Sequence, residues 1–174
     1  MTTRGKISES DKAYLAGVID SDGSISVIRS YLQRKEYRCP RFVLEMTVTN
    51  TEPTMMQWIK DKFGGSYCTR KRSNIVYIDG RKITPKQITY NWKATAKKGL
   101  GILEQIVPYL IGKKRQAELA IEFQKNILNR KMKSVKAGTG LSHYLADEEI
   151  SKRTWYSKTI QKLNKHLISP AETK

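Results

Sequence analysis

One stretch near the N-terminus, residues 15–23, constrains the fold of this chain more than any other. It consists of Leu-Ala-Gly-Val-Ile-Asp-Ser-Asp-Gly, in which small and apolar residues lead into two carboxylates and a glycine. Ser8 and Asp11 precede it as helix-start signals, so we predict a helix that runs to about Ile19 or Asp20. We expect Gly23 to leave this helix through a backbone conformation that other residues avoid.

The acidic end of this helix is electrostatically unusual. A helix carries the negative end of its macrodipole at the C-terminus, so Asp20 and Asp22 are unfavourable there unless a positive charge compensates them. A divalent cation is the natural candidate. The sequence therefore suggests a metal site at the end of this helix.

The same helix has two distinct faces. One face carries residues expected in the core: Tyr14, Leu15, Val18 and Ile19. The other is a stripe of small residues that ends in an acid: Ala13, Ala16, Gly17 and Asp20. Such a stripe lets a second helix approach closely. The alternative is that Ala16 and Gly17 pack beneath the sheet of their own subunit.

The rest of the chain predicts an α+β domain. Alternating and β-branched segments predict strands at residues 24–32, 41–50, 66–72, 75–78, 81–83 and 88–95, with a charged loop at 33–38. Helical spacing and caps predict helices at about 53–63, 97–110, 113–130 and 147–166. The resulting order, αββαββα followed by further helices, is typical of helices packed on one face of an antiparallel sheet.

The domain organisation follows from the same pattern. We expect residues 1–130 to form a core domain and residues 131–174 a basic, partly helical extension. Two roles for the extension stay open, namely extra phosphate contacts and packing beside the core.

Charge narrows the function. The chain has 33 Lys and Arg against 16 Asp and Glu, a formal net charge of +17. Such a field favours a polyanionic partner, most often nucleic acid. The sequence has no apolar run long enough to span a membrane and no secretory signal, so we expect a cytoplasmic or organellar protein. Cys39 and Cys68 lack metal-ligand spacing and are expected to be reduced thiols.

Residues 15–23 resemble the signature of the LAGLIDADG homing endonucleases at seven of nine positions, with differences at Val18 and Ser21. The resemblance extends from about Lys12 to Leu128. It implies the αββαββα fold with a saddle-shaped sheet that lies along the DNA major groove. It also implies intron homing by a homodimer with the two motif helices packed at the dyad, which cleaves double-stranded DNA at a long, near-palindromic site.

The resemblance also implies roles for individual residues. Asp22 would be the catalytic metal ligand, and Ser21 would offer its backbone carbonyl to the metal. Asn50 matches a position that orders active-site water, and Lys113 matches a lysine that reaches the scissile region. Mg²⁺ is the expected ion, with Mn²⁺ as a substitute. The alternatives are a turn residue for Asn50 and a solvated helix start for Lys113, while Asp20 is expected to support the helix end and the dimer seam.

The predicted strands supply the residues expected to contact DNA. Alternation puts eight of them on the open face of the sheet: Ser26, Ile28, Ser30, Arg41, Glu45, Thr47, Asn91 and Lys93. The charged loop adds Arg34, Lys35 and Arg38, and the third strand adds Arg70 and Arg72, although the facing of residues 70–72 stays open.

Two other function classes compete with a nuclease. One is a cleavage-deficient LAGLIDADG-like protein that acts as a transcription regulator or as a maturase on intron RNA. The other is a basic RNA-binding structural protein, which would leave the paired acids unexplained.

Overall fold

The computed structural model describes residues 6–34, 37–71, 76–78, 81–83, 88–129 and 147–165, and the side chains of these except 32–34, 37–39, 70–71, 76–78 and 81–83. The described helices are α1 (Glu9–Asp22), α2 (Pro53–Phe63), α3 (Ala96–Ile106), the short 3-10 helix η1 (Val107–Tyr109), α4 (Lys114–Asn129) and α5 (Asp147–Asn164). The strands are β1 (Gly23–Arg34), β2 (Tyr37–Asn50), β3 (Ser66–Lys71), β4 (Val76–Ile78), β5 (Arg81–Ile83) and β6 (Ile88–Thr95).

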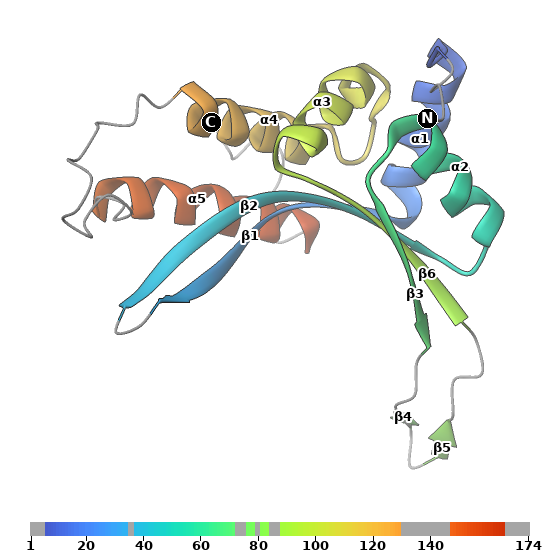
Figure 1. Ribbon diagram of the computed structural model, residues 1–174, viewed down its shortest axis with the longest axis horizontal. Coiled ribbons are helices and arrows are strands. Elements are labelled where there is room, and N and C mark those ends of the chain that lie inside the picture. Colours follow the sequence, from blue (N-terminus) through green and yellow to red (C-terminus); the bar gives the residue numbers. More distant parts are fainter. Residues whose placement is uncertain are drawn as a thin grey trace.

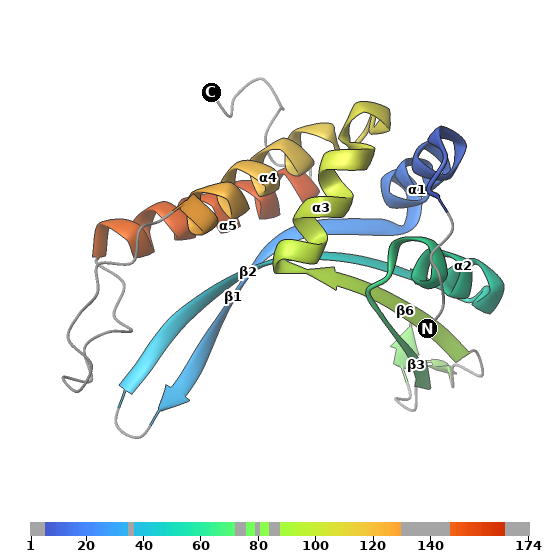
Figure 2. The ribbon, with the colours of Figure 1, turned by 45° about the horizontal axis from the view of Figure 1, so that its top comes forward.

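Four of these strands form one antiparallel sheet in the order β1-β2-β6-β3, and β4 pairs with β5 in a separate ribbon. The large sheet arches, and the helices lie on its convex side (Figures 1 and 2). Helices α4 and α5 contact β1, and α2 contacts β6 and β3. None of the described helices lies on the opposite, concave face of the sheet, which confirms the predicted α+β architecture.

Strand alternation explains the two faces of this sheet. In β2, Phe42, Leu44, Met46 and Val48 are buried against the helices, as the period of two predicts. Ile25 and Val27 of β1 and Trp92 and Ala94 of β6 continue the same buried layer. The intervening side chains therefore point to the open face.

Three element boundaries differ from the prediction. The predicted loop at 33–38 is largely strand, because β1 and β2 stay paired as far as Arg34 and Tyr37. The helix predicted at 97–110 ends at Ile106 and continues as the 3-10 helix η1, since Pro108 lacks the N–H that an α-helix would need. Helix α1 continues to Asp22, beyond the predicted end.

Helix α5 packs as part of the core. Its residues Tyr156, Thr159, Ile160 and Leu163 are buried against β1 and α4. Burial and a 2.5 Å hydrogen bond from the Tyr156 hydroxyl to Glu122 raise the pKa of Tyr156 to about 12. Residues 147–164 therefore fulfil the packing role, one of the two left open for the extension. Residues 130–146 lie outside the described part of the chain, so the boundary at residue 130 stays a prediction.

Helix α5 also covers the outer edge of the sheet. The hydroxyl of Ser157 donates to the carbonyl of Val27 at 2.6 Å, and the amide of Asn164 donates to the carbonyl of Ile25 at 2.9 Å. These carbonyls belong to the unpaired side of β1, which is the first strand of the sheet. Among the described residues, no helix has both the length and the apolar character needed to cross a membrane.

Candidate functional site

The two aspartates at the end of α1 have different surroundings. The carboxylate of Asp20 accepts three backbone hydrogen bonds, from Ile111 at 2.7 Å, Gly112 at 3.1 Å and Lys113 at 2.8 Å. These N–H groups belong to the three residues that precede α4, so the carboxylate lies near the positive end of that helix's dipole. Asp20 is therefore engaged within its own chain and supports the helix end, as expected, while its place in a dimer seam stays a prediction.

Lys113 provides the positive charge that the end of α1 requires. Its ammonium group donates to the carbonyl of Ile19 at 2.9 Å and to that of Asp20 at 2.5 Å. Both carbonyls belong to the last turn of α1, where a cation is favourable. A lysine of the same chain thus supplies positive charge at this helix end. The solvated helix start that was the alternative for Lys113 does not describe it.

Asp22 is exposed, and a single side chain orients it. The amide nitrogen of Asn50 donates to Oδ2 of Asp22 at 2.7 Å. The amide oxygen of Asn50 accepts from the backbone of Thr51 at 2.7 Å and of Glu52 at 3.0 Å, so the carboxamide cannot turn without losing these bonds. Asn50 is thus both a turn residue, which was the alternative expectation for it, and the hydrogen-bond partner of the predicted catalytic carboxylate.

Ser21 and Gly23 flank Asp22. The Ser21 side chain is exposed, and its hydroxyl donates to the carbonyl of Val18 at 3.3 Å. Gly23 has φ −95° and ψ 170°, which is extended backbone open to any residue, so the expected special conformation is wrong. A glycine is required at this position because a larger residue has no room: its Cβ would lie 2.6 Å from the Cα of Ile19.

The outward face of α1 differs from the predicted stripe. Ala13 and Gly17 are exposed, and nothing lies within 4 Å of the position that a Cβ of Gly17 would take. Ala16 is fully buried in its own chain, so it is not an interface residue, and the packing alternative holds for it. Tyr14, expected in the core, is 52% exposed and packs edge-on against Trp58, with ring centroids 5.0 Å apart. The buried stripe is rotated relative to the prediction because α1 rests on β1, β2, α3 and η1 together.

The start of α1 is tied to α2. The carboxylate of Asp11 accepts from the Ser8 backbone at 2.9 Å and pairs with Lys62 at 3.1 Å. The bond from Ser8, followed by that from Lys62, lowers the pKa of Asp11 below its model-peptide value. Helix α1 is thus anchored at its start as well as at its end.

The open face of the sheet carries the predicted DNA-contact residues. Ile28, Ser30 and Arg41 are exposed there, and the others that the structure describes are half-buried: Ser26, Glu45, Thr47, Asn91 and Lys93. Arg34, Arg38 and Arg70 lie in strands, but their side chains are outside the described set, as are Lys35 and Arg72 entirely.

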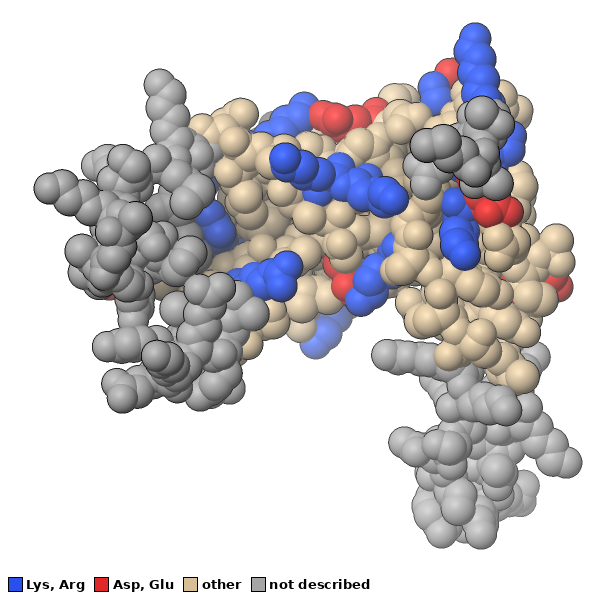
Figure 3. Space-filling view, viewed as in Figure 1, with Lys and Arg blue, Asp and Glu red and all other residues tan. Residues whose placement is uncertain are grey.

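Several of these polar side chains are held by neighbours across the strands. Lys93 pairs with Glu45 at 2.5 Å, and Asn91 donates to the hydroxyl of Thr49 at 2.7 Å. Thr49 was not among the predicted contacts, although its place in the alternation could have identified it. The face therefore offers an ordered row of donors and acceptors. Lys and Arg also outnumber acids on the side of the molecule seen in Figure 3.

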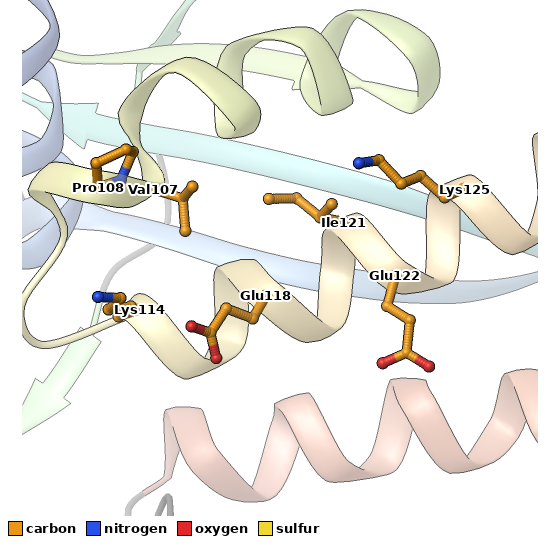
Figure 4. Close-up of a pocket in the computed structure, with 7 residues that line it drawn as sticks. All are labelled: Val107, Pro108, Lys114, Glu118, Ile121, Glu122 and Lys125. Carbon is orange, nitrogen blue, oxygen red and sulfur yellow. The ribbon is translucent and has the colours of Figure 1, made fainter.

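A separate hollow of about 410 Å³ lies between η1 and α4 (Figure 4). Val107, Pro108 and Ile121 give it an apolar surface, and two lysines and two glutamates surround it. None of the predicted site residues lines it. The candidate site is therefore the end of α1 together with the open face of the sheet.

The family comparison matches the motif region. The family model described as the PI-PfuI endonuclease subdomain matches residues 10–100, which is more than half of the chain. A comparison with curated proteins gives no match.

Solved homing endonucleases share the fold. The homing endonuclease I-CvuI, in complex with its target in the presence of calcium, aligns with a TM-score of 0.60 and 20% identity over 89% of this chain and 82% of that chain. The archaeal intron-encoded homing endonuclease I-Vdi141I, complexed with DNA, aligns with a TM-score of 0.57 and 19% identity over 89% and 84%.

A third solved structure is matched over a smaller share of its own length than these two. The meganuclease I-SmaMI, bound to uncleavable DNA, aligns with a TM-score of 0.58 and 14% identity over 85% of this chain but only 44% of that chain. The family model, the motif at residues 15–23 and the shared fold agree, and the chain belongs to the LAGLIDADG homing endonuclease family.

Proposed function

We propose that this protein is a site-specific double-strand DNA endonuclease that acts as a homodimer with divalent metal ions. The observation that carries the proposal is the division of labour between the two motif aspartates. Asp20 is used to join α1 to α4, whereas Asp22 is exposed and oriented by Asn50. Asp22 is exposed and held in one orientation, so its carboxylate is suited to binding a metal ion and contributes little to the stability of the fold.

Double-stranded DNA is the substrate that the open face fits. Strands β1 and β2 contain 12 and 14 residues, and at about 3.3 Å per residue they are roughly 40 Å long, somewhat more than one duplex turn. The face carries polar side chains suited to base edges, and the net charge of +17 per chain suits the phosphates. I-CvuI, I-Vdi141I and I-SmaMI were solved in complex with DNA, which supports the same substrate here.

A second copy of the chain is the partner that the outer face of α1 fits. Gly17 has open space where a Cβ would lie, so another helix backbone can come close. Beside it, Tyr14 and Trp58 line an open groove of about 540 Å³, and Ile111, next to the Asp20 joint, is 90% exposed. The chain spans most of I-CvuI but less than half of I-SmaMI, as expected for a single unit that must pair.

The residues present fit a divalent metal shared between two subunits. The described residues of one chain contain no group of three or more His, Cys, Asp or Glu side chains that could hold an ion. Two-fold symmetry through α1 would bring a second Asp22 to the first, and phosphate oxygens and water would complete a shell of hard oxygen ligands. The donor set is that of Mg²⁺, with Mn²⁺ as a substitute.

Each residue then has a defined task in phosphodiester hydrolysis. Asp22 and the carbonyl of Ser21 would hold the metal, which supplies Lewis acidity and a more acidic bound water. Asn50 keeps the Asp22 carboxylate in one orientation. Lys113 and Asp20 fix the end of α1, and the open face of the sheet holds the duplex in register.

The decisive experiment is cleavage of a randomised duplex library with Mg²⁺, followed by sequencing of the products. We expect the wild-type protein to cut a long, near-palindromic site, and Asp22→Asn to bind that site without cutting it. Asp61→Asn, an exposed acid on α2, is the matched control and should cut normally. Normal cleavage by Asp22→Asn would contradict the metal assignment. Wild-type protein that binds duplexes of the library but cuts none of them would indicate the cleavage-deficient class instead.

A further inference from the structure

A polar pocket of about 390 Å³ lies where the outer edge of β1 meets α5. Ser26 and Arg29 contribute to it from the strand, and Ser157, Lys158, Gln161 and Asn164 from the helix. None of these α5 residues was predicted to contact DNA. The pocket joins the sheet that carries the proposed DNA face to the helix of the C-terminal extension.

The charge of this pocket sets it apart from the other two described hollows. Arg29 and Lys158 line it, and no carboxylate does. The hollow beside α4 contains Glu118 and Glu122, and the groove beside Tyr14 contains Asp11 and Glu52. The edge pocket is therefore the one of the three that suits an anion.

The walls of the pocket are held in place. Ser157 and Asn164 are bonded to the carbonyls of Val27 and Ile25, which fixes α5 on the strand. The guanidinium of Arg29 lies over the rings of Tyr31 and Phe42, with its Cζ 5.3 and 5.6 Å from their centroids. Lys158 is exposed one residue after Ser157. Both cations thus stand on ordered backbone at the edge of the sheet.

One buried atom on the pocket wall lacks a partner. The amide oxygen of Asn164 is buried, and no described residue donates to it. A buried acceptor of this kind costs free energy unless something donates to it.

The place of the pocket identifies the anion. Ser26 and Ile28 point to the open face, whereas Arg29 points to the helical side, so the pocket spans the rim of the sheet. A duplex lying on the open face would carry one phosphate backbone past this rim. We propose that Arg29 and Lys158 form a phosphate-binding subsite for the DNA backbone outside the groove that the sheet reads. This inference rests on the proposed function.

Salt dependence of binding tests the subsite. The probe is a duplex that carries the site selected by wild-type cleavage. Each phosphate contact contributes about 0.9 to the slope of log affinity against log salt. The proposed homodimer loses one contact in each subunit. Between 50 and 200 mM salt, wild-type affinity should therefore fall about twelvefold more than that of Lys158→Ala, a change derived from that slope. The loss in Lys158→Ala should be uniform across site variants, because phosphates carry no sequence information.

A matched control separates the subsite from general charge. Lys162→Ala removes an exposed lysine of the same helix that does not line the pocket, and it should keep nearly the wild-type slope. Equal slopes for Lys158→Ala and Lys162→Ala would overturn the subsite while leaving the nuclease intact. Failure of the wild type to select any duplex would instead overturn the proposed function.

Discussion

Asp20 and Lys113 bind each other reciprocally. The carboxylate of Asp20 accepts the backbone N–H of Lys113 at 2.8 Å, and the ammonium group of Lys113 donates to the backbone carbonyl of Asp20 at 2.5 Å. The end of α1 and the start of α4 are therefore fixed to each other, although about 90 residues separate them in the chain. Asp22 follows this joint by two residues, so the joint determines where the proposed catalytic carboxylate lies.

The joint predicts that substitutions of the two aspartates change the free energy of unfolding by different amounts. Asp20→Asn keeps the shape but loses the charge and one acceptor oxygen, so that at least one backbone N–H loses its partner. It should lower the free energy of unfolding by about 1–2 kcal/mol, the usual cost of leaving such a donor unpaired. Asp22→Asn should change stability by less than about 0.5 kcal/mol, as expected for an exposed surface position. Urea unfolding monitored by circular dichroism checks both. A larger loss in Asp22→Asn than in Asp20→Asn would contradict the assignment.

Asn50 is predicted to act through Asp22. Asn50→Ala removes the hydrogen bond that orients the carboxylate and should lower the cleavage rate by about 10–100-fold, as loss of an outer partner of a metal ligand usually does. Affinity for the selected duplex should change little. Single-turnover cleavage and a binding titration separate the two effects. Asn129→Ala, an exposed residue at the end of α4, is the control and should cut at the wild-type rate.

Gly17 is predicted to matter for assembly and not for folding. Gly17→Leu places a side chain in open space and should leave the folded monomer intact, since leucine favours a helix more than glycine does. A second helix could then no longer approach closely, so we expect a monomer in light scattering and no double-strand cleavage. Gly101→Leu on α3 also enters open space and should remain a dimer. A dimeric Gly17→Leu would place the interface elsewhere.

Asp11 should make folding sensitive to acid. Its pKa in the folded chain lies below the ordinary value of 3.8, chiefly through the Ser8 backbone and then through Lys62. As the pH falls, Asp11 therefore takes up its proton in the unfolded chain before it does so in the folded chain. The stabilisation from Asp11 is complete above pH 3.8 and is lost as the pH falls through the lower pKa of the folded chain. Asp11→Asn should flatten the dependence of stability on pH below about 4, and Lys62→Met should flatten it less. Denaturant unfolding at pH 3, 4 and 6 tests this order.

Local patterns were sufficient to predict the two faces of the sheet. The alternation from Phe42 to Val48 identified both faces of β2, because a strand that is buried on one side leaves its period of two in the sequence. Gly64 and Pro53 likewise bounded α2. The faces of α1 were harder, since a helix turns continuously and its neighbours decide which stripe is buried. Tyr14 and Ala16 were therefore assigned to the wrong sides.

The candidate site was likewise predictable only in part. Asp22 could be proposed from the motif, because the motif is a local pattern. The contacts of Asp20 with residues 111–113, and of α5 with Ile25 and Val27, join segments far apart in the chain. Nothing in the sequence near Lys113 indicates that its ammonium group binds the end of another helix. Such pairings depend on the tertiary fold, which residue patterns alone do not contain.

The bonds from Ser157 and Asn164 to β1 have a consequence for assembly. Free carbonyls on an outer strand can recruit a strand of another molecule, and repeated recruitment produces fibres. Here a helix of the same chain occupies the carbonyls of Ile25 and Val27. Two chains that meet through α1 would therefore form a closed particle, bounded by α5 at each outer β1 edge, with no strand there to extend it.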